Sequence, residues 1–318
     1  MVIILKIILT GGFTGGHIIP LIRLKKKYEN EFQFEYVGFN GYLEEKLAKD
    51  NNISFIGLKK NKNILQLFIF IFKWFKILNT KIKKTDLIIS SGGFHSFPLV
   101  LYARIKKIKY ILIEENSKMG ILNLLFKEKA YRTISNFPLK NCLYMLNPSV
   151  YFSAKPTYKQ YDFLIIGGSL GSKILANLAI KLSKKKKVLL IAGRYDKIYK
   201  QYENSNLKVL GFVNVSEYYR QANIIICRAG SSTIFELIAI NSCFILIPSM
   251  KTKRNHQYFN AKYINDNKLG LMIEENKIDS TNFYEYLNFD FSKIIDNQKK
   301  FINSFDGDSY GNIIRKAY

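Results

Sequence analysis

The feature that most constrains the fold is an apolar run that ends in a glycine-rich turn and leads into a helix. Ile3–Thr10 precedes the glycines of the loop from Gly11 to Gly16. The pattern restarts with Asp162–Ile166, followed by the loop Gly167–Ser172. Continuous apolar runs of this kind are typical of strands buried on both faces of a parallel sheet. Two successive series of strands and helices, each opening with such a junction, predict an α/β protein with two doubly wound, Rossmann-like domains.

The length and one break in the pattern indicate where the domains divide. The chain has 318 residues, enough for two domains of ordinary size. Asn147-Pro148 and the polar stretch that runs to Tyr161 interrupt the pattern and predict a linker. We expect domains at 1–148 and 149–301, with a tail helix at about 302–318 that packs back on the first domain. Ligands of such sheets bind at the carboxyl ends of the strands, so we expect the site in a cleft between two facing sheets.

The segment Ile224–Ile240 carries the most informative junction. It predicts a buried strand at Ile224–Cys227, a loop at Arg228–Ser232 and a helix that begins near Thr233. The N–H groups and the dipole at the start of such a helix suit a phosphate group. Glu236, expected in the first turn, would accept hydrogen bonds from the ribose of a nucleotide diphosphate. The alternative is a capping box, in which Thr233 and Glu236 satisfy N–H groups of their own helix and bind nothing else.

The net charge indicates the kind of partner, and the cysteines indicate the redox environment. The formal net charge of +25 suggests an anionic partner: a membrane surface, a nucleic acid or a phosphorylated substrate. Drift in composition toward lysine is the alternative explanation. No recognised nucleic-acid-binding module is present, and we expect no such partner. Cys142, Cys227 and Cys243 lack CxxC spacing, which predicts reduced thiols in a cytosolic protein and no zinc site.

Two further features each admit a functional and a structural interpretation. His17 is a candidate general base or a hydrogen-bond donor to a sugar or phosphate, unless it merely caps its helix. Ile64–Leu78 is the most apolar stretch, but its length of about 15 residues and its two lysines, Lys73 and Lys76, make it unsuitable to span a bilayer. It predicts a helix in the interface of an anionic membrane or a core helix packed on the sheet. Both could hold if one face of the helix meets the membrane and the other meets the sheet.

Seven motifs occur in one order across almost the whole chain. They are TGGxTGGH with a proline three residues later, SGGxxSxP, EEN, GGSxGS, GFV, CRAGSSTxxE and HQxxNA. This series closely resembles the MurG family of bacterial N-acetylglucosaminyltransferases, which convert lipid I to lipid II. Members of that family have the GT-B fold, with two Rossmann-like domains facing a central cleft. Any one motif is weak, whereas seven in order are highly specific.

The resemblance implies an inverting glycosyltransferase of peptidoglycan synthesis. It would move GlcNAc from UDP-GlcNAc to the C4 hydroxyl of undecaprenyl-pyrophosphoryl-MurNAc-pentapeptide (lipid I). UDP-GlcNAc is then a substrate, and no tightly bound cofactor or metal is expected. The resemblance also implies a peripheral position on the cytoplasmic face of the bacterial plasma membrane, with Ile64–Leu78 and its flanking lysines on the anionic lipid surface.

The resemblance also assigns roles to individual residues. His17 would lie beside the reacting centre as the catalytic base. Asn116 and Gln257 would reach the sugar, Val213 the uracil and Glu236 the ribose. The full expected donor set is Thr14, Gly15, Gly16, Asn116, Ser169, Val213, Arg228, Ser231, Ser232, Thr233, Glu236 and Gln257. The acceptor pyrophosphate is expected at Gly12, Gly92, Gly93 and His95.

The chain departs from the family pattern at several positions. Family members carry an arginine soon after the Asn-Pro of the linker, whereas none follows Asn147-Pro148. Its contact would come from Lys155 or Arg228, or be missing. Phe13 replaces a glycine of the first loop and Ile113 replaces a histidine. Two alternatives stay open: a GT-B transferase with another lipid-linked acceptor, and a catalytically degenerate nucleotide-sugar-binding protein.

Overall fold

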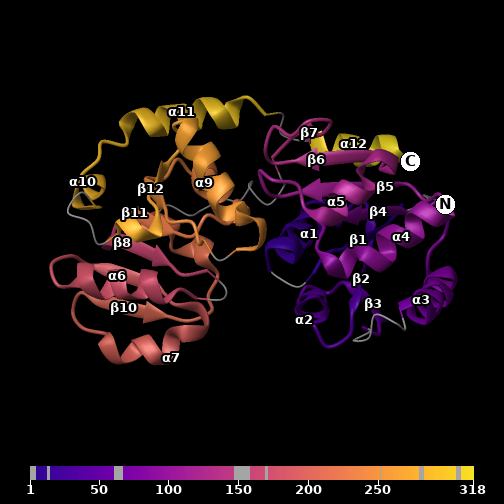
Figure 1. Ribbon diagram of the computed structural model, residues 1–318, viewed down its shortest axis with the longest axis horizontal. Helices are drawn as coiled ribbons and strands as arrows, with labels where there is room; N and C mark the ends of the chain where they lie inside the picture. The colour runs from indigo at the N-terminus through magenta and orange to yellow at the C-terminus, as the bar shows by residue number, and fades with distance from the viewer. Residues whose placement is uncertain are drawn as a thin grey trace. The chain divides into compact units, whose positions relative to one another are not determined.

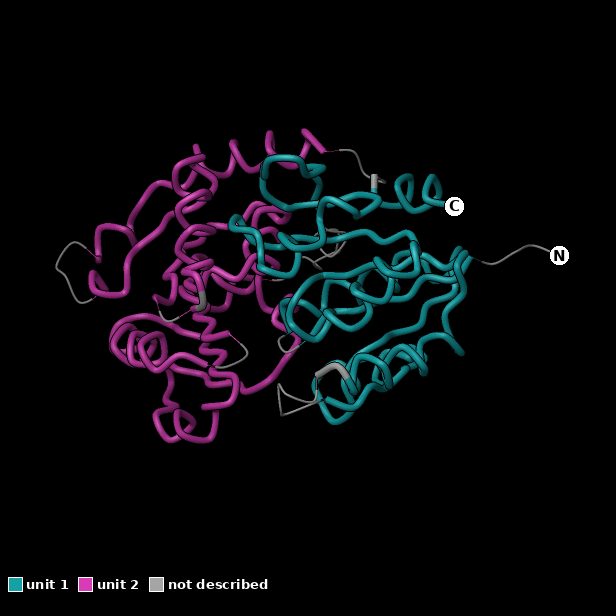
Figure 2. Tube along the Cα trace, turned by 45° about the vertical axis from the view of Figure 1, so that its right-hand side comes forward, with its two compact units in different colours: residues 1–149, 306–318 teal, residues 150–305 magenta. Residues whose placement is uncertain are grey.

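The computed structural model describes residues 5–12, 15–60, 67–146, 158–168, 171–250, 252–278, 283–305 and 309–318. The chain forms two compact units, which Figure 2 colours separately. Unit 1 comprises Met1–Ser149 and Asp306–Tyr318, and unit 2 comprises Val150–Phe305. Each unit contains one parallel β-sheet with its helices packed against it (Figure 1). The predicted fold class, two Rossmann-like α/β domains, is confirmed.

The sheet of unit 1 has the order β3-β2-β1-β4-β5-β6-β7, and all its pairs are parallel. Ile7 and Leu9 of β1 enter a core on one face, and Ile8 enters a second core on the other. Both faces of the sheet are therefore covered, which explains the continuous apolar runs. The strands are β1 (Lys6–Thr10), β2 (Gln33–Phe39), β3 (Ser54–Leu58), β4 (Leu87–Ser90), β5 (Tyr110–Glu114), β6 (Arg132–Ser135) and β7 (Leu143–Tyr144). The helices are α1 (Gly15–Tyr28), α2 (Leu43–Asp50), α3 (Leu67–Lys81), α4 (Phe97–Lys106), α5 (Ile121–Phe126) and α12 (Ser309–Ala317).

The sheet of unit 2 repeats this topology with the order β10-β9-β8-β11-β12-β13. Its strands are β8 (Tyr161–Ile166), β9 (Val188–Ile191), β10 (Leu207–Leu210), β11 (Ala222–Cys227), β12 (Phe244–Leu246) and β13 (Leu271–Met272). Its helices are α6 (Lys173–Ser183), α7 (Asp196–Tyr199), α8 (Ser231–Ala239), α9 (His256–Asp266), α10 (Phe283–Leu287) and α11 (Ser292–Asn303).

The direction of winding reverses between β1 and β4 in unit 1 and between β8 and β11 in unit 2. At such a switch point the loops from neighbouring strands run to opposite faces, and the space between them can take a ligand. The glycine-rich loops of the sequence follow these four strands. The fold thus places them where a doubly wound sheet binds its ligands.

Several local expectations need correction. The sequence predicts a helix from Pro20 to Tyr28 with the proline in its first turn. Helix α1 instead begins at Gly15, so Pro20 lies inside it. Helix α8 begins at Ser231, two residues before the expected start. Strands β3, β7 and β13 were not predicted; the last two are only two residues long. At the end of the chain, Tyr310, Ile314 and Ala317 of α12 join the core of unit 1.

The described cysteines are all free thiols, and burial raises the pKa of Cys227 to about 12, which makes it unreactive. None of the helices in the described ranges is long and apolar enough to cross a membrane.

Candidate active site

His17 lies in the first turn of α1 and faces the loop that follows β4. Its Nδ1 is 2.8 Å from the carbonyl oxygen of Ser91, and the Ser91 hydroxyl donates to the backbone carbonyl of His17. Because a carbonyl can only accept, Nδ1 carries the proton and Nε2 is the basic nitrogen of the neutral ring. The two loops of the switch point therefore hold the imidazole in the tautomer that a general base requires, and Nδ1 contacts a neighbouring strand's loop instead of capping its own helix.

The glycines of the second loop allow this close approach. Gly92 and Gly93 have φ values of 81° and 80°, in the left-handed region that favours glycine. A Cβ at Gly93 would lie 3.0 Å from the Gly12 carbonyl oxygen and 3.2 Å from Cδ2 of His17. The loops after β1 and β4 thus touch through glycine backbone, and the structure brings three expected acceptor residues together with the expected base.

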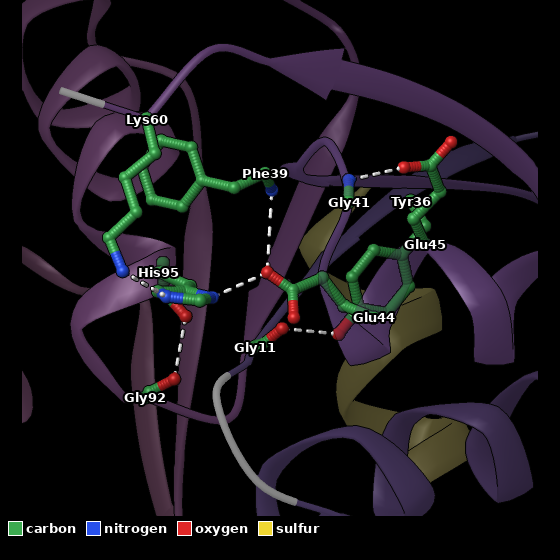
Figure 3. A network of polar contacts seen from close by, with 10 residues as sticks. Gly11, Tyr36, Phe39, Gly41, Glu44, Glu45, Lys60, Gly92 and His95 are labelled. Atoms are coloured by element: carbon green, nitrogen blue, oxygen red, sulfur yellow. Dashed lines mark hydrogen bonds and ion pairs between the residues drawn. The ribbon is translucent and has the colours of Figure 1, made fainter.

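His95, which was expected at the acceptor site, has a buried side chain that pairs with Glu44. Its ring is buried, with a relative exposure of 3%, between the rings of Phe39 and Tyr42. Its Nδ1 is 2.5 Å from Oε1 of Glu44, whose exposure is 0% (Figure 3). Burial alone would raise the pKa of Glu44, but the hydrogen bonds from His95 and from backbone amides outweigh it and lower the pKa. Nε2 of His95 lies 3.4 Å from Nζ of Lys60.

A second buried carboxylate positions Asn116. Glu114 ends β5 and accepts hydrogen bonds from the backbone N–H of Asn116 at 3.0 Å and from that of Gly120 at 2.8 Å. The side-chain amide of Asn123 also donates to Oε2 of Glu114, at 2.9 Å. Glu114 therefore shapes the loop that carries Asn116. The role of Glu114 could not be predicted, because the EEN motif alone does not show which of its three side chains faces the protein interior.

In unit 2, the helix start that was expected to face a phosphate lies at Ser231. Gly230 precedes the helix, and no side chain caps it, so the capping box that begins at Thr233 does not form. The N–H groups of the first turn have no acceptor within the helix, as at every helix start. Ser231, Ser232 and Thr233 make up this turn. The segment can therefore present backbone N–H groups to a diphosphate.

Glu236 lies in the second turn of α8 and not the first. Its side chain is buried, and Oε2 accepts a hydrogen bond of 2.7 Å from the hydroxyl of Tyr219, which is also buried. Tyr219 precedes β11 and was not predicted as part of the site. The hydrogen bond fixes the orientation of the carboxylate and directs its second oxygen, Oε1, elsewhere.

Arg228 braces the loops of unit 2. Its guanidinium donates to the carbonyl of Ile247 at 3.0 Å and to the hydroxyl of Ser172 at 2.7 Å. It also pairs with Oε1 of Glu275 at 2.5 Å. These contacts all lie within unit 2, and through them Arg228 joins the loops that follow β8, β11 and β12. Its expected contact with the donor stays a prediction.

The remaining expected donor residues are placed as follows. Oε1 of Gln257 accepts from the Ser249 N–H at 2.9 Å, which leaves the amide nitrogen to donate. Asn260 links the same helix to the loop before α8 through the Ala229 carbonyl. Val213 is half-buried in the loop after β10, next to the exposed Phe212. Gly15 and Gly16 open α1, whereas Thr14, Ser169 and Lys155 lie outside the described residues.

No group of three or more His, Cys, Asp and Glu side chains suited to a metal ion occurs within the described ranges.

Known proteins share both units. Residues 7–135 match the glycosyltransferase family 28 N-terminal domain, and residues 163–306 match the glycosyltransferase family 28 C-terminal domain. The UDP-N-acetylglucosamine–N-acetylmuramyl-(pentapeptide) pyrophosphoryl-undecaprenol N-acetylglucosamine transferase of Vesicomyosocius okutanii is 32% identical over 290 residues, which cover 85% of this chain and 84% of that protein. The transferase of the same name from Clostridium tetani is 29% identical over 347 residues, covering 96% and 94%.

A solved structure agrees at the level of the fold. The crystal structure of Acinetobacter baumannii MurG has a TM-score of 0.71 at 20% identity and covers 92% of this chain and 93% of that one. Together with the ordered motifs and the two switch points, these relatives identify the chain as a member of the UDP-N-acetylglucosamine–N-acetylmuramyl-(pentapeptide) pyrophosphoryl-undecaprenol N-acetylglucosamine transferase family.

Proposed function

We propose that this protein transfers GlcNAc from UDP-GlcNAc to the C4 hydroxyl of the MurNAc unit of lipid I, giving lipid II. The relatives are named for this transfer, and family membership supports both substrates. The observation that carries the proposal is the contact of His17 Nδ1 with the Ser91 carbonyl at 2.8 Å. It leaves Nε2 as a base beside the glycine loops of unit 1.

The reaction requires one proton transfer and one displacement. Nε2 of His17 takes the proton of the C4 hydroxyl, while the hydroxyl oxygen forms a bond to C1 of GlcNAc. The bond from C1 to the diphosphate oxygen breaks on the opposite face, and UDP leaves with the electron pair. A single displacement inverts the anomeric carbon and gives a β-1,4 linkage. The sugar carbon gains oxocarbenium character as the leaving group departs.

Unit 2 would stabilise the departing UDP. Negative charge grows on the diphosphate, and the N–H groups at the start of α8 are donors that need no reorganisation. Glu236, held by Tyr219, would accept hydrogen bonds from the ribose hydroxyls. The amide nitrogen of Gln257 would donate to the sugar. The backbone donors fill a role for which other transferases use a metal ion.

The test compares UDP release from UDP-GlcNAc with and without lipid I. His17→Ala should lower kcat by about 100-fold to 10,000-fold, the usual contribution of a general base, with the affinity for UDP nearly unchanged. Normal turnover of this variant would remove His17 from the role of base. Wild-type transfer to a different lipid-linked acceptor would change the proposed substrate, and donor binding without any transfer would support the degenerate alternative.

We also propose a peripheral position on the cytoplasmic face of the membrane, through helices α3, α4 and α5. One face of α3 buries Trp74 and Leu78 in the core. The other exposes 57% of Ile69 and 74% of Phe72 beside the exposed lysines at 73 and 76. Both interpretations of this segment thus have support. The neighbouring helices continue the apolar surface with Ile105, Ile121, Leu124 and Leu125, each at least 42% exposed.

Vesicle sedimentation tests this surface. Replacing Ile69 and Phe72 with serine should weaken binding to anionic vesicles more than tenfold. Burial of each apolar side chain in the membrane interface would contribute up to about 1.5–3 kcal/mol, and the serine variants lose this contribution. Ile198→Ser, at an exposed position on α7 of unit 2, is the matched control. Equal loss in both variants would contradict a docking role for α3.

A further inference from the structure

We propose that Lys60 binds a phosphate group of the acceptor and that the buried pair of His95 and Glu44 positions its ammonium for this role. The proposal rests on the proposed function and adds a charged residue to the acceptor site of unit 1. It assigns a purpose to a polar network that neither the general base nor the donor site uses (Figure 3).

The hydrogen bonds of the network determine which way it is polarised. Glu44 ends in a carboxylate that can only accept, so Nδ1 of His95 donates to it at 2.5 Å. The Lys60 ammonium can only donate, so Nε2 of His95, 3.4 Å from Nζ, is the accepting nitrogen of a neutral ring. Glu44 on one side and Lys60 on the other thus define one tautomer of His95, and the imidazole links the carboxylate to the ammonium. His95 is a positioning residue that does not touch the ligand.

The described contacts of Lys60 are both with neutral groups. Besides the imidazole, its ammonium lies 4.5 Å from the centroid of the Tyr42 ring. No carboxylate of the described residues forms an ion pair with it, and the side chain is half-buried. An ammonium has three N–H donors, of which the imidazole takes one. A cation held in this way can bind an anion at little further cost in side-chain entropy.

The network lies directly against the glycine loops. A Cβ at Gly12 would be 2.9 Å from Nδ1 of His95 and 3.0 Å from Cδ of Glu44. Lys60 follows β3, and His95 follows Gly92-Gly93 after β4, so both lie at the carboxyl edge of the sheet. The Lys60 ammonium is therefore held beside the residue that ends the second glycine turn.

The loops themselves lack a full positive charge. The segments GGFTGGH at 11–17 and SGGFHSFP at 91–98 contain no lysine or arginine. Their backbone N–H groups can donate to phosphate, but a diphosphate ester carries about two negative charges that N–H groups alone do not neutralise. Lys60 supplies the missing countercharge and would favour a diphosphate-linked acceptor over a neutral glycolipid.

The experiment uses the full chain in a neutral detergent. Lys60→Met should raise the KM for lipid I roughly tenfold, the loss of one charge-assisted hydrogen bond, with kcat within about threefold because the contact is present before and during the reaction. Lys60→Arg should recover most of the affinity. Lys59→Met removes the neighbouring exposed lysine and should leave KM unchanged. Equal KM values for Lys60→Met and the wild type would overturn the proposal while leaving the transferase function intact.

Two further arms separate the source of the phosphate and the role of His95. Binding of a polyprenyl diphosphate should weaken in Lys60→Met, which tests Lys60 even in a protein without transfer. If Lys60→Met loses binding to anionic vesicles but still binds the polyprenyl diphosphate normally, Lys60 contacts lipid headgroups and the acceptor role is overturned. His95→Phe should raise KM in the wild type but not in the Lys60→Met background, because positioning has no effect once the ammonium is gone. Equal effects in both backgrounds would reject the positioning role.

Discussion

Replacing Tyr219 with phenylalanine should destabilise unit 2 and weaken donor binding through Glu236. The change removes one hydroxyl and keeps the ring in place, so it creates almost no cavity. The hydroxyl donates to Oε2 of Glu236 at 2.7 Å, and both side chains are at most 5% exposed. A hydrogen bond to a charged group contributes about 1.5–3 kcal/mol. A loss of about 2 kcal/mol should lower the melting temperature of a unit of this size by roughly 4–8 °C.

Thermal unfolding with and without saturating UDP measures this effect, together with the KM for UDP-GlcNAc. Tyr218→Phe is the matched control, since the described contacts of the adjacent tyrosine include no hydrogen bond from its hydroxyl; its change should stay within about 0.5 kcal/mol. In a Glu236→Gln background the cost of Tyr219→Phe should shrink, because the acceptor is no longer charged. A cost equal to that of the control, or one that is the same in both backgrounds, would refute the reasoning.

Three further predictions concern unit 1. Gly93→Ala should reduce both stability and turnover, since an added Cβ meets Gly12 and His17 at a positive φ; Gly41→Ala, with φ 78° and no atom within 4 Å of the new Cβ, isolates the backbone cost of about 1–2 kcal/mol in a urea titration. Because the pKa of Glu44 is lowered from its ordinary value of 4.5, its charged form stabilises the fold above that pH and this stability is lost as the pH falls through the lowered pKa. Urea titrations should therefore show Glu44→Gln less stable than the wild type at pH 7 and the gap closing below about pH 4.5; a constant gap would contradict the shift. Ile314→Ala, in the α12 core position with 1% exposure, should cost about 2–5 kcal/mol in unit 1, and a cost below about 1 kcal/mol would show that α12 adds little to that core.

The strands and the switch points were predictable because their signals are local. The run Leu87–Ser90, with Gly92 and Gly93 one residue beyond it, indicates a buried strand and the turn that follows it. The doubly wound order then follows from short right-handed crossovers between parallel strands. Strands β7 and β13 escaped prediction because two residues carry no periodicity. The early start of α1 was missed because its first two residues are glycines, which have a poor helix propensity.

The polar partners of the site were not predictable, because each lies far away in the sequence. His95 and Glu44 are separated by 51 residues, and Tyr219 and Glu236 by 17. A histidine in a glycine-rich loop has the same local signal whether it faces a ligand or a buried carboxylate. Only the packing of β2 and α2 against the turn that follows β4 distinguishes these cases, since Phe39 of β2 and Glu44 of α2 both contact His95. The pairing of His95 with Glu44 is therefore a long-range contact that no local motif indicates.

The tautomer of His17 shows how such a site tolerates change in its sequence. The acceptor for Nδ1 is a backbone carbonyl, so it does not depend on which side chain occupies position 91. It depends on the path of the loop, and that path requires the positive φ values of Gly92 and Gly93. The proposed base is thus a single histidine, whereas its protonation pattern depends on two glycines more than 70 residues away.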